Sequence, residues 1–123
     1  MKKILLFQVE QPMNVKLALA TMHLRVEAIP NEQFGQKIDN LVSGMIEEVE
    51  LFSGDKPEGS LLLMCDLTSS EIDQVLYRLR NKKINITYKA ILTAANRNWT
   101  VPELFVEMEK EKKAMEAKYK LIN

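Results

Sequence analysis

Two apolar runs, each about as long as a β-strand, constrain the fold of this 123-residue chain more than any other feature. The first is "KILLFQV" at residues 3–9, and the second is "SLLLMCDL" at residues 60–67. A strand with one face in water alternates apolar and polar residues, whereas a strand covered on both faces is apolar throughout. We therefore expect both runs to be central strands of one sheet that carries helices on both faces.

Two further segments with strand character complete the predicted sheet, "RVEAIP" at 25–30 and "INITYKAILT" at 84–93. A helical pattern precedes each of them, which indicates strand–helix–strand crossovers of the usual right-handed kind. We predict a single α/β domain over residues 1–123, with four mainly parallel strands in the order 2-1-3-4. Lys89 marks the last strand as an edge, because a charge there discourages sheet-to-sheet pairing. The alternative is a ferredoxin-like α+β sheet in which residues 31–59 decorate a link.

Three other segments have helical or loop character. Residues 31–45 carry a helical stripe, and residues 47–59 have the composition of a loop. The helix after Thr68 has a clean apolar face, and Ser70 with Asp73 approximates a capping box. Lys82 and Lys83 at its C-terminal side are interpreted as a solvated helix end, where positive charge suits the helix dipole. The stripe of the first segment comprises Phe34, Ile38, Leu41, Val42 and Met45.

The last segment, residues 101–123, is predicted to be a long helix with charges nearly all round. Its first turns have an apolar patch that should dock on the body, and apolar residues resume at Met115, Tyr119 and Ile122. Beyond Lys112 two interpretations stay open. The helix either extends into solvent beyond the body, or it packs on a second subunit and forms a homodimer.

Charge and cysteine content exclude several classes of protein. Seventeen basic and seventeen acidic residues give a net charge of zero, which argues against a nucleic-acid or membrane-surface binder. The single cysteine, Cys65, forms no intrachain disulfide and is expected to be a buried, inert thiol. No apolar run reaches the length of a transmembrane helix, and the N-terminal run is too short for a secretory signal. We expect a cytoplasmic protein.

The block "YKAILTAANRNWT" at residues 88–100, with Phe34, Gly35 and Gln36 earlier in the chain, resembles a bacterial family called domain of unknown function 3783. The chain departs from the family pattern at Ala94, Ala95 and Arg97. The resemblance implies a fold and a distinctive stretch, but no reaction.

Part of this block is explained by folding needs. Thr100 and Glu103 form a predicted capping box, and Trp99 is placed to pack on Leu104 as a hydrophobic staple. The Trp99 indole as a ligand-stacking surface is the alternative. Residues 93–98 are less easily explained.

In a parallel sheet this polar stretch would lie beside the ends of the two central strands, where open α/β sheets bind ligands. Amides, hydroxyls and helix N-termini at one edge suit a small polar or anionic ligand. The candidate ligand-binding residues are Gln8, Asp66, Thr68, Ser69, Thr93, Asn96 and Asn98.

Signals for catalysis are weak. The only histidine, His23, has no evident carboxylate partner, and no phosphate-binding, dinucleotide-binding or nucleophile motif is present. We expect no cofactor and no metal. We favour a non-catalytic module that binds a small polar ligand or acts in regulation. An interaction protein that uses the last helix is the alternative, and an enzyme that uses Asp66 is the least favoured.

Overall fold

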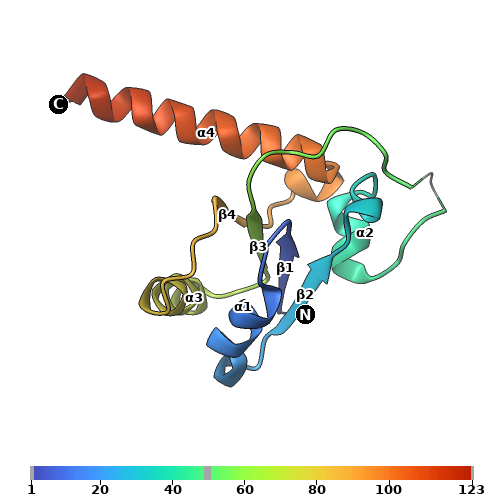
Figure 1. Ribbon diagram of the computed structural model, residues 1–123, viewed down its shortest axis with the longest axis horizontal. Helices are drawn as coiled ribbons and strands as arrows, with labels where there is room; N and C mark the ends of the chain where they lie inside the picture. Colours follow the sequence, from blue (N-terminus) through green and yellow to red (C-terminus); the bar gives the residue numbers. More distant parts are fainter. Residues whose placement is uncertain (1, 49–50, 123) are drawn as a thin grey trace.

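The computed structural model describes residues 2–48 and 51–122, with side chains as far as Tyr119. One four-stranded sheet, in the order β2-β1-β3-β4, forms the centre of the molecule (Figure 1). The predicted strand order is therefore correct, and both apolar runs are central strands. The strands are β1 (Lys3–Phe7), β2 (Arg25–Ile29), β3 (Leu61–Cys65) and β4 (Tyr88–Ile91).

The prediction of a mainly parallel sheet is wrong, because the sheet is mixed. β1 runs parallel to β2 and β3 runs parallel to β4, but the central pair β1 and β3 is antiparallel, with Leu5 opposite Leu63. This pattern also differs from the ferredoxin-like alternative, in which another strand separates the two strands of each split βαβ unit, whereas here β1 pairs directly with β2 and β3 pairs directly with β4. The long connection between β2 and β3 allows the reversal, since it can return the chain to either end of the sheet.

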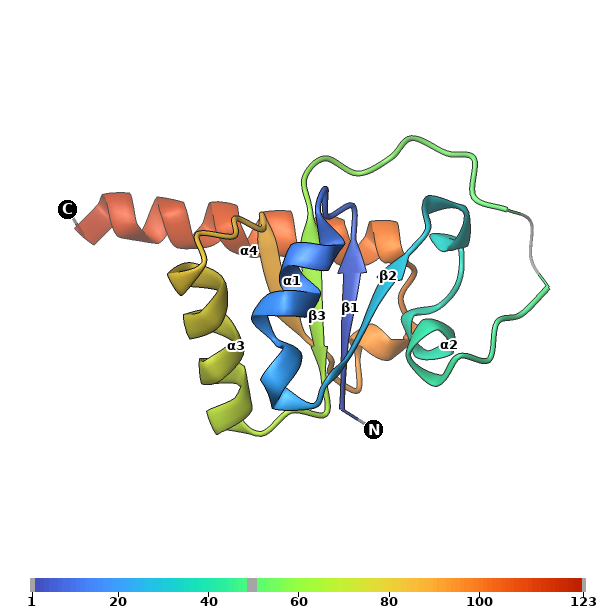
Figure 2. The same ribbon diagram turned by 60° about the horizontal axis from the view of Figure 1, so that its bottom comes forward.

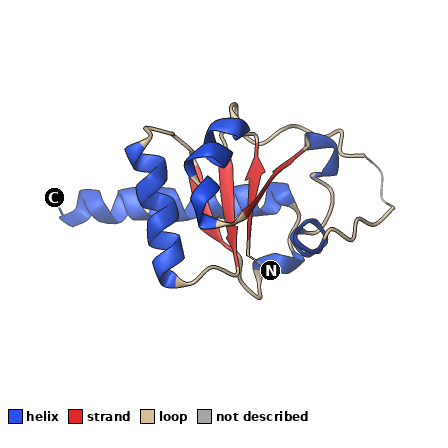
Figure 3. Cartoon of the chain, turned by 90° about the horizontal axis from the view of Figure 1, so that it is seen from below, coloured by secondary structure: helices blue, strands red, loops and turns tan. Residues whose placement is uncertain are grey.

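Helices cover both faces of the sheet, as predicted (Figure 3). One face packs against α1 (Pro12–Ala18) and α3 (Ser69–Asn81), and the other packs against α2 (Ile38–Ser43) and the first turns of α4 (Val101–Ile122). Alternate residues of β1 and β3 point into the two opposite cores. Every residue of these two strands is buried, which explains why both runs are apolar.

The helical segment predicted at 31–45 is broken in two. A short 3₁₀ turn, η2 (Asn31–Gln33), is followed by an irregular stretch, and α2 begins only at Ile38. The break occurs because the backbone N–H of Ile38 donates to the carbonyl of Trp99 at 2.8 Å, which fixes the start of α2 against the start of α4. Met45, which was expected on the buried stripe, is 74% exposed, because the helix ends at Gly44.

The cap of α3 also differs from the prediction by two residues. Thr68 is the N-cap, and its side chain accepts from the backbone N–H of Glu71 while the Glu71 carboxylate accepts from the backbone N–H of Thr68. Thr68 has extended backbone angles, as an N-cap residue requires, so the capping box lies two residues earlier than Ser70 and Asp73.

The two halves of the chain repeat one arrangement of elements. The first half has the order β1, α1, β2, η2, α2, with an additional 3₁₀ turn, η1 (Ala20–Met22), before β2. The second half has the order β3, α3, β4, η3 (Asn96–Asn98), α4. Left-handed residues occur at matching places, Gln8 and Asp66 after the first strands, and His23 and Lys83 before the second strands. The antiparallel β1–β3 pair thus relates two similar units by an approximate two-fold axis.

The last helix extends past the body of the domain. Figures 1 and 2 show α4 crossing one face of the sheet and continuing beyond β4 to the C-terminus. Its first turns are buried at Val101, Leu104 and Phe105, whereas Met115 and Tyr119 are 68% and 70% exposed. Ile122, predicted to continue the stripe, lies outside the described side chains.

Candidate functional site

The structure divides the predicted ligand-binding residues between two opposite edges of the sheet. These edges are formed by the ends of the strands and are distinct from the lateral edge at β4. Because β1 and β3 are antiparallel, Gln8 after β1 lies at the opposite edge from Asp66 after β3. The Gln8 amide donates to the carbonyls of Pro57 and Gly59 at 2.7 and 2.9 Å, and it accepts from the Asn31 amide at 3.0 Å. Gln8 therefore ties together the loops at its own edge and does not join the other predicted residues.

Thr93 and Asn96 do lie together, after β4. The Asn96 side chain accepts from the Thr93 N–H at 2.8 Å and donates to the Ile91 carbonyl at 3.0 Å, while the Thr93 hydroxyl accepts from the Asn96 N–H at 3.1 Å. Asn96 is only 6% exposed. These three hydrogen bonds close the turn between β4 and η3. The Thr93 and Asn96 side chains therefore stabilise the backbone of the turn.

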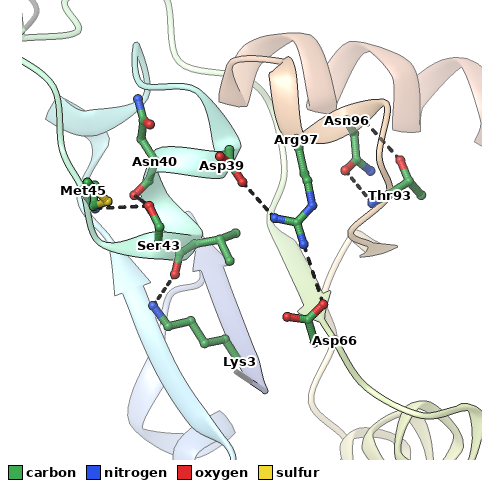
Figure 4. A network of polar contacts seen from close by, with 10 residues as sticks. Lys3, Asp39, Asn40, Ser43, Met45, Asp66, Thr93, Asn96 and Arg97 are labelled. Carbon is green, nitrogen blue, oxygen red and sulfur yellow. Dashed lines mark hydrogen bonds and ion pairs between the residues drawn. The ribbon is translucent and has the colours of Figure 1, made fainter.

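Arg97 connects this turn to the end of β3 (Figure 4). Its guanidinium lies 2.8 Å from a carboxylate oxygen of Asp39 on α2 and 3.7 Å from a carboxylate oxygen of Asp66. Sequence reasoning left Arg97 out of the candidate site. The signal was present, because Arg97 is the only cation between Thr93 and Trp99 and Asp66 is the only acid at the end of β3. At this edge the Arg97 guanidinium thus forms ion pairs with two carboxylates of the same chain.

The remaining candidates take part in helix starts or face solvent. Thr68 caps α3, and Ser69 and Asn98 are exposed. The carbonyl of Trp99 accepts from Ile38, and its indole packs against the core cluster that includes Leu104. The indole also borders a hollow of about 340 Å³ beside Val106, so a stacking role for it stays a prediction.

At the start of α4 the predicted pairing of Thr100 with Glu103 is present in part. The Glu103 carboxylate accepts from both the backbone N–H and the hydroxyl of Thr100, at 3.2 and 2.9 Å. These hydrogen bonds, the backbone one first, lower the pKa of the Glu103 carboxyl.

The earlier part of the resemblance, Phe34 to Gln36, is also structural. Phe34 is fully buried between the rings of Phe7 and Phe52. Gln36 is 4% exposed, and its amide exchanges two hydrogen bonds with the backbone of Glu47, at 2.7 and 3.1 Å. It holds the chain beyond α2 against the body.

Two ionisable side chains, those of Lys3 and Cys65, are buried in the core. The Lys3 ammonium donates to the carbonyl of Val42 at 2.5 Å and lies 3.5 Å from the Glu27 carboxylate. Burial raises the pKa of the Cys65 thiol to about 12, and the adjacent Asp66 carboxylate acts in the same direction. Cys65 is thus a protonated core residue, as expected of a thiol inside a central strand.

A polar hollow of about 510 Å³ lies at the edge that contains Gln8. It is formed by the segment from Gln8 to Asn14, by Gly59 and Ser60 ahead of β3, and by the loop from Lys82 to Asn85 after α3. The sequence reasoning assigned Lys82 and Lys83 to a solvated helix end, and Gln8 is the only predicted site residue in this hollow. The signal that could have found it is the run of cations next to Asn85.

The described part of the chain has neither a cluster of metal-ligating side chains nor a membrane-spanning helix. Within residues 2–48 and 51–122, no group of three or more His, Cys, Asp or Glu side chains is placed to hold a metal ion. Among these same residues, no helix is both long enough and apolar enough to cross a membrane.

Fold and site together define a small single-domain α/β protein. Most of its predicted site residues form hydrogen bonds within its own loops and helix starts. Residues 60–115 match the family described as Domain of unknown function (DUF3783). This confirms the resemblance seen in the block at 88–100. The match covers β3, α3, β4 and most of α4, the second of the two repeated units. No curated protein and no solved structure matches the chain.

Proposed function

We propose that the protein is a non-catalytic cytoplasmic module that binds a small anionic ligand in the hollow beside Lys82 and Lys83. The observation that carries this proposal is the pair of adjacent lysines on one wall of a polar hollow at the end of β1. Both lysines are exposed, and lysine side chains are flexible. Their ammonium groups can therefore contact phosphate or carboxylate groups of different shapes.

The rest of the lining supports an anion of small size. Glu10 is the single acid among the lining residues, so the two lysines leave one net positive charge. Side-chain amides of Gln11, Asn14 and Asn85 border the same hollow and can donate to ligand oxygens. At the opposite edge, by contrast, Arg97 already bridges two carboxylates. The ligand site is therefore proposed at the Gln8 edge.

The test is calorimetric titration and thermal shift with inorganic phosphate, pyrophosphate and short dicarboxylates. A variant with Lys82→Gln and Lys83→Asn removes both charges, and asparagine tolerates the left-handed backbone at position 83. Lys16→Gln with Lys37→Gln is the matched control, because both lysines are exposed and neither lines the hollow. At 100-fold excess over Kd, binding should stabilise the fold by about 2.7 kcal/mol. Binding that persists in the first variant, or no binding of any probe, would contradict the proposal.

A second function is supported by α4. An interaction module that uses this helix would explain why Val106, Met115 and Tyr119 are exposed on a helix that extends beyond the body. Substitution of Met115 by glutamate should then abolish self-association or partner binding in sedimentation experiments without changing the circular dichroism spectrum. A wild-type chain that stays monomeric and binds no partner would contradict this function.

A further inference from the structure

The apolar stripe that docks α4 on the sheet continues along the helix past the sheet edge. Met108 is half-buried against the core, and Met115 follows two turns later on the same side of the helix. Met115 is nevertheless 68% exposed, because β4 is the last strand on this side and α4 continues beyond it (Figure 2). The side of α4 that packs on the sheet in its first turns thus continues past β4, where the chain has no further strand to cover it.

The edge strand beneath that projection has backbone groups that face outward. The N–H groups of Tyr88 and Leu92 donate to the carbonyls of Ser60, just before β3, and of Met64 in β3. The backbone groups of Tyr88 and Leu92 therefore point toward β3. Since successive residues of a strand direct their N–H and C=O groups to opposite sides, those of Lys89 and Ile91 point away from the sheet. The Ile91 side chain is 49% exposed, which is unusual for an isoleucine of a sheet.

The charges of α4 suit a second copy of this helix in antiparallel orientation. Residues 101–111 contain four glutamates and one lysine, a net charge of −3. Residues 112–122 contain four lysines and one glutamate, a net charge of +3. Two such helices side by side and antiparallel place each acidic half against a basic half, whereas a parallel pair would place like charges together.

We propose that β4 is the docking edge for a second copy of the chain, which adds its own β4 antiparallel and extends the sheet to eight strands. The two-fold axis of such a pair makes the two α4 helices antiparallel on one face of the joined sheet, in the orientation that their charges favour. Each projecting helix then covers apolar surface of the partner subunit with Met115. This inference rests on the second function proposed above and specifies its partner.

Lys89 determines which register is compatible with this pairing. If Lys89 faced its own symmetry mate, two ammonium groups would lie opposite each other, which is destabilising. A two-fold axis at Ala90 instead places Lys89 opposite Ile91 of the partner subunit. In that register the outward N–H of each residue meets an outward carbonyl. The Ile91 carbonyl, which accepts from Asn96, keeps a second lone pair for this hydrogen bond.

The test uses the full chain in analytical ultracentrifugation over a range of concentrations. The wild type should approach twice the chain mass of 14.2 kDa at high concentration. Ile91→Pro removes an outward N–H that the β3 pairing does not use, and should leave a folded monomer. Ile91→Thr keeps the N–H and the β-branched shape, and should still dimerise. A second measurement on the wild type, amide hydrogen exchange, should show slower exchange at Lys89 and Ile91 as concentration rises.

The outcomes separate this inference from the function on which it rests. A dimer that survives Ile91→Pro but is lost in Met115→Glu overturns the edge pairing and keeps an interaction through α4. A monomer at all concentrations overturns both. Exchange at Lys89 and Ile91 that does not depend on concentration also overturns the edge pairing, even if Ile91→Pro fails to fold.

Discussion

Substitution of Asn96 by alanine tests whether the distinctive block at 88–100 is structural. The change deletes the acceptor for the Thr93 N–H at 2.8 Å and the donor to the Ile91 carbonyl at 3.0 Å. A single hydrogen bond contributes about 1 kcal/mol net, and a buried group left unpaired costs about 1–3 kcal/mol. Thr93 and Ile91 are exposed residues that water can reach, so we expect the lower end for each. The total loss should be about 2 kcal/mol.

Urea unfolding followed by circular dichroism measures this loss. At a slope typical of a small domain, about 2 kcal/mol lowers the midpoint by roughly 1 M without changing the slope. Asn98→Ala is the matched control, because Asn98 lies in the same 3₁₀ turn, is exposed, and makes no side-chain hydrogen bond within the described residues. The control should change stability by less than about 0.5 kcal/mol. Equal effects of the two substitutions would refute the structural assignment of Asn96.

Three further predictions concern burial, acid and backbone conformation. Cys65 should resist thiol reagents in the native state at pH 8 and react on unfolding, and fast native labelling would contradict its raised pKa. The hydrogen bond from the Thr68 backbone N–H lowers the pKa of the Glu71 carboxyl below its usual 4.5, so the ionised carboxylate contributes stability above pH 4.5, and this contribution is lost as pH falls through the lower pKa. A Glu71→Gln variant should therefore show a shallower dependence of unfolding free energy on acid pH. An unchanged slope would contradict this. Gly44→Ala, with open space around a φ of +77°, should cost about 1 kcal/mol in urea unfolding. Gly59→Ala should cost more, because its φ is +90° and the new methyl carbon would lie 2.9 Å from a threonine hydroxyl; equal costs would show that this contact is unimportant.

Side-chain patterns predicted the parts of the fold that depend on burial. A strand covered on both faces must be apolar throughout, so β1 and β3 were correctly placed in the centre. The apolar face of α3 was likewise clear, and Val75 and Leu79 are buried. The segment at 31–45 was predicted less well, because its break depends on a hydrogen bond between Ile38 and Trp99, which are 61 residues apart. Such a contact leaves no local pattern.

The candidate site shows the same limit. Asp66, Thr93 and Asn96 were placed at one edge correctly, because β3 and β4 are joined by a crossover and are parallel. Gln8 was placed there wrongly, because its position depends on the direction of β1 relative to β3. Lys82 and Lys83 were interpreted only as cations near a helix end, since a hollow is a property of three separate segments.

The sequence by itself determined which strands are central, where the edge strand lies and where the long helix begins, since burial and helix starts depend on residues close in the chain. Only the tertiary structure decided the direction of β3 relative to β1. Alternating side chains alone do not distinguish a parallel from an antiparallel pair, and a connection of some thirty residues between Ile29 and Leu61 can return at either end. That one direction decides which strand ends meet, and therefore on which edge of the sheet a ligand site can form.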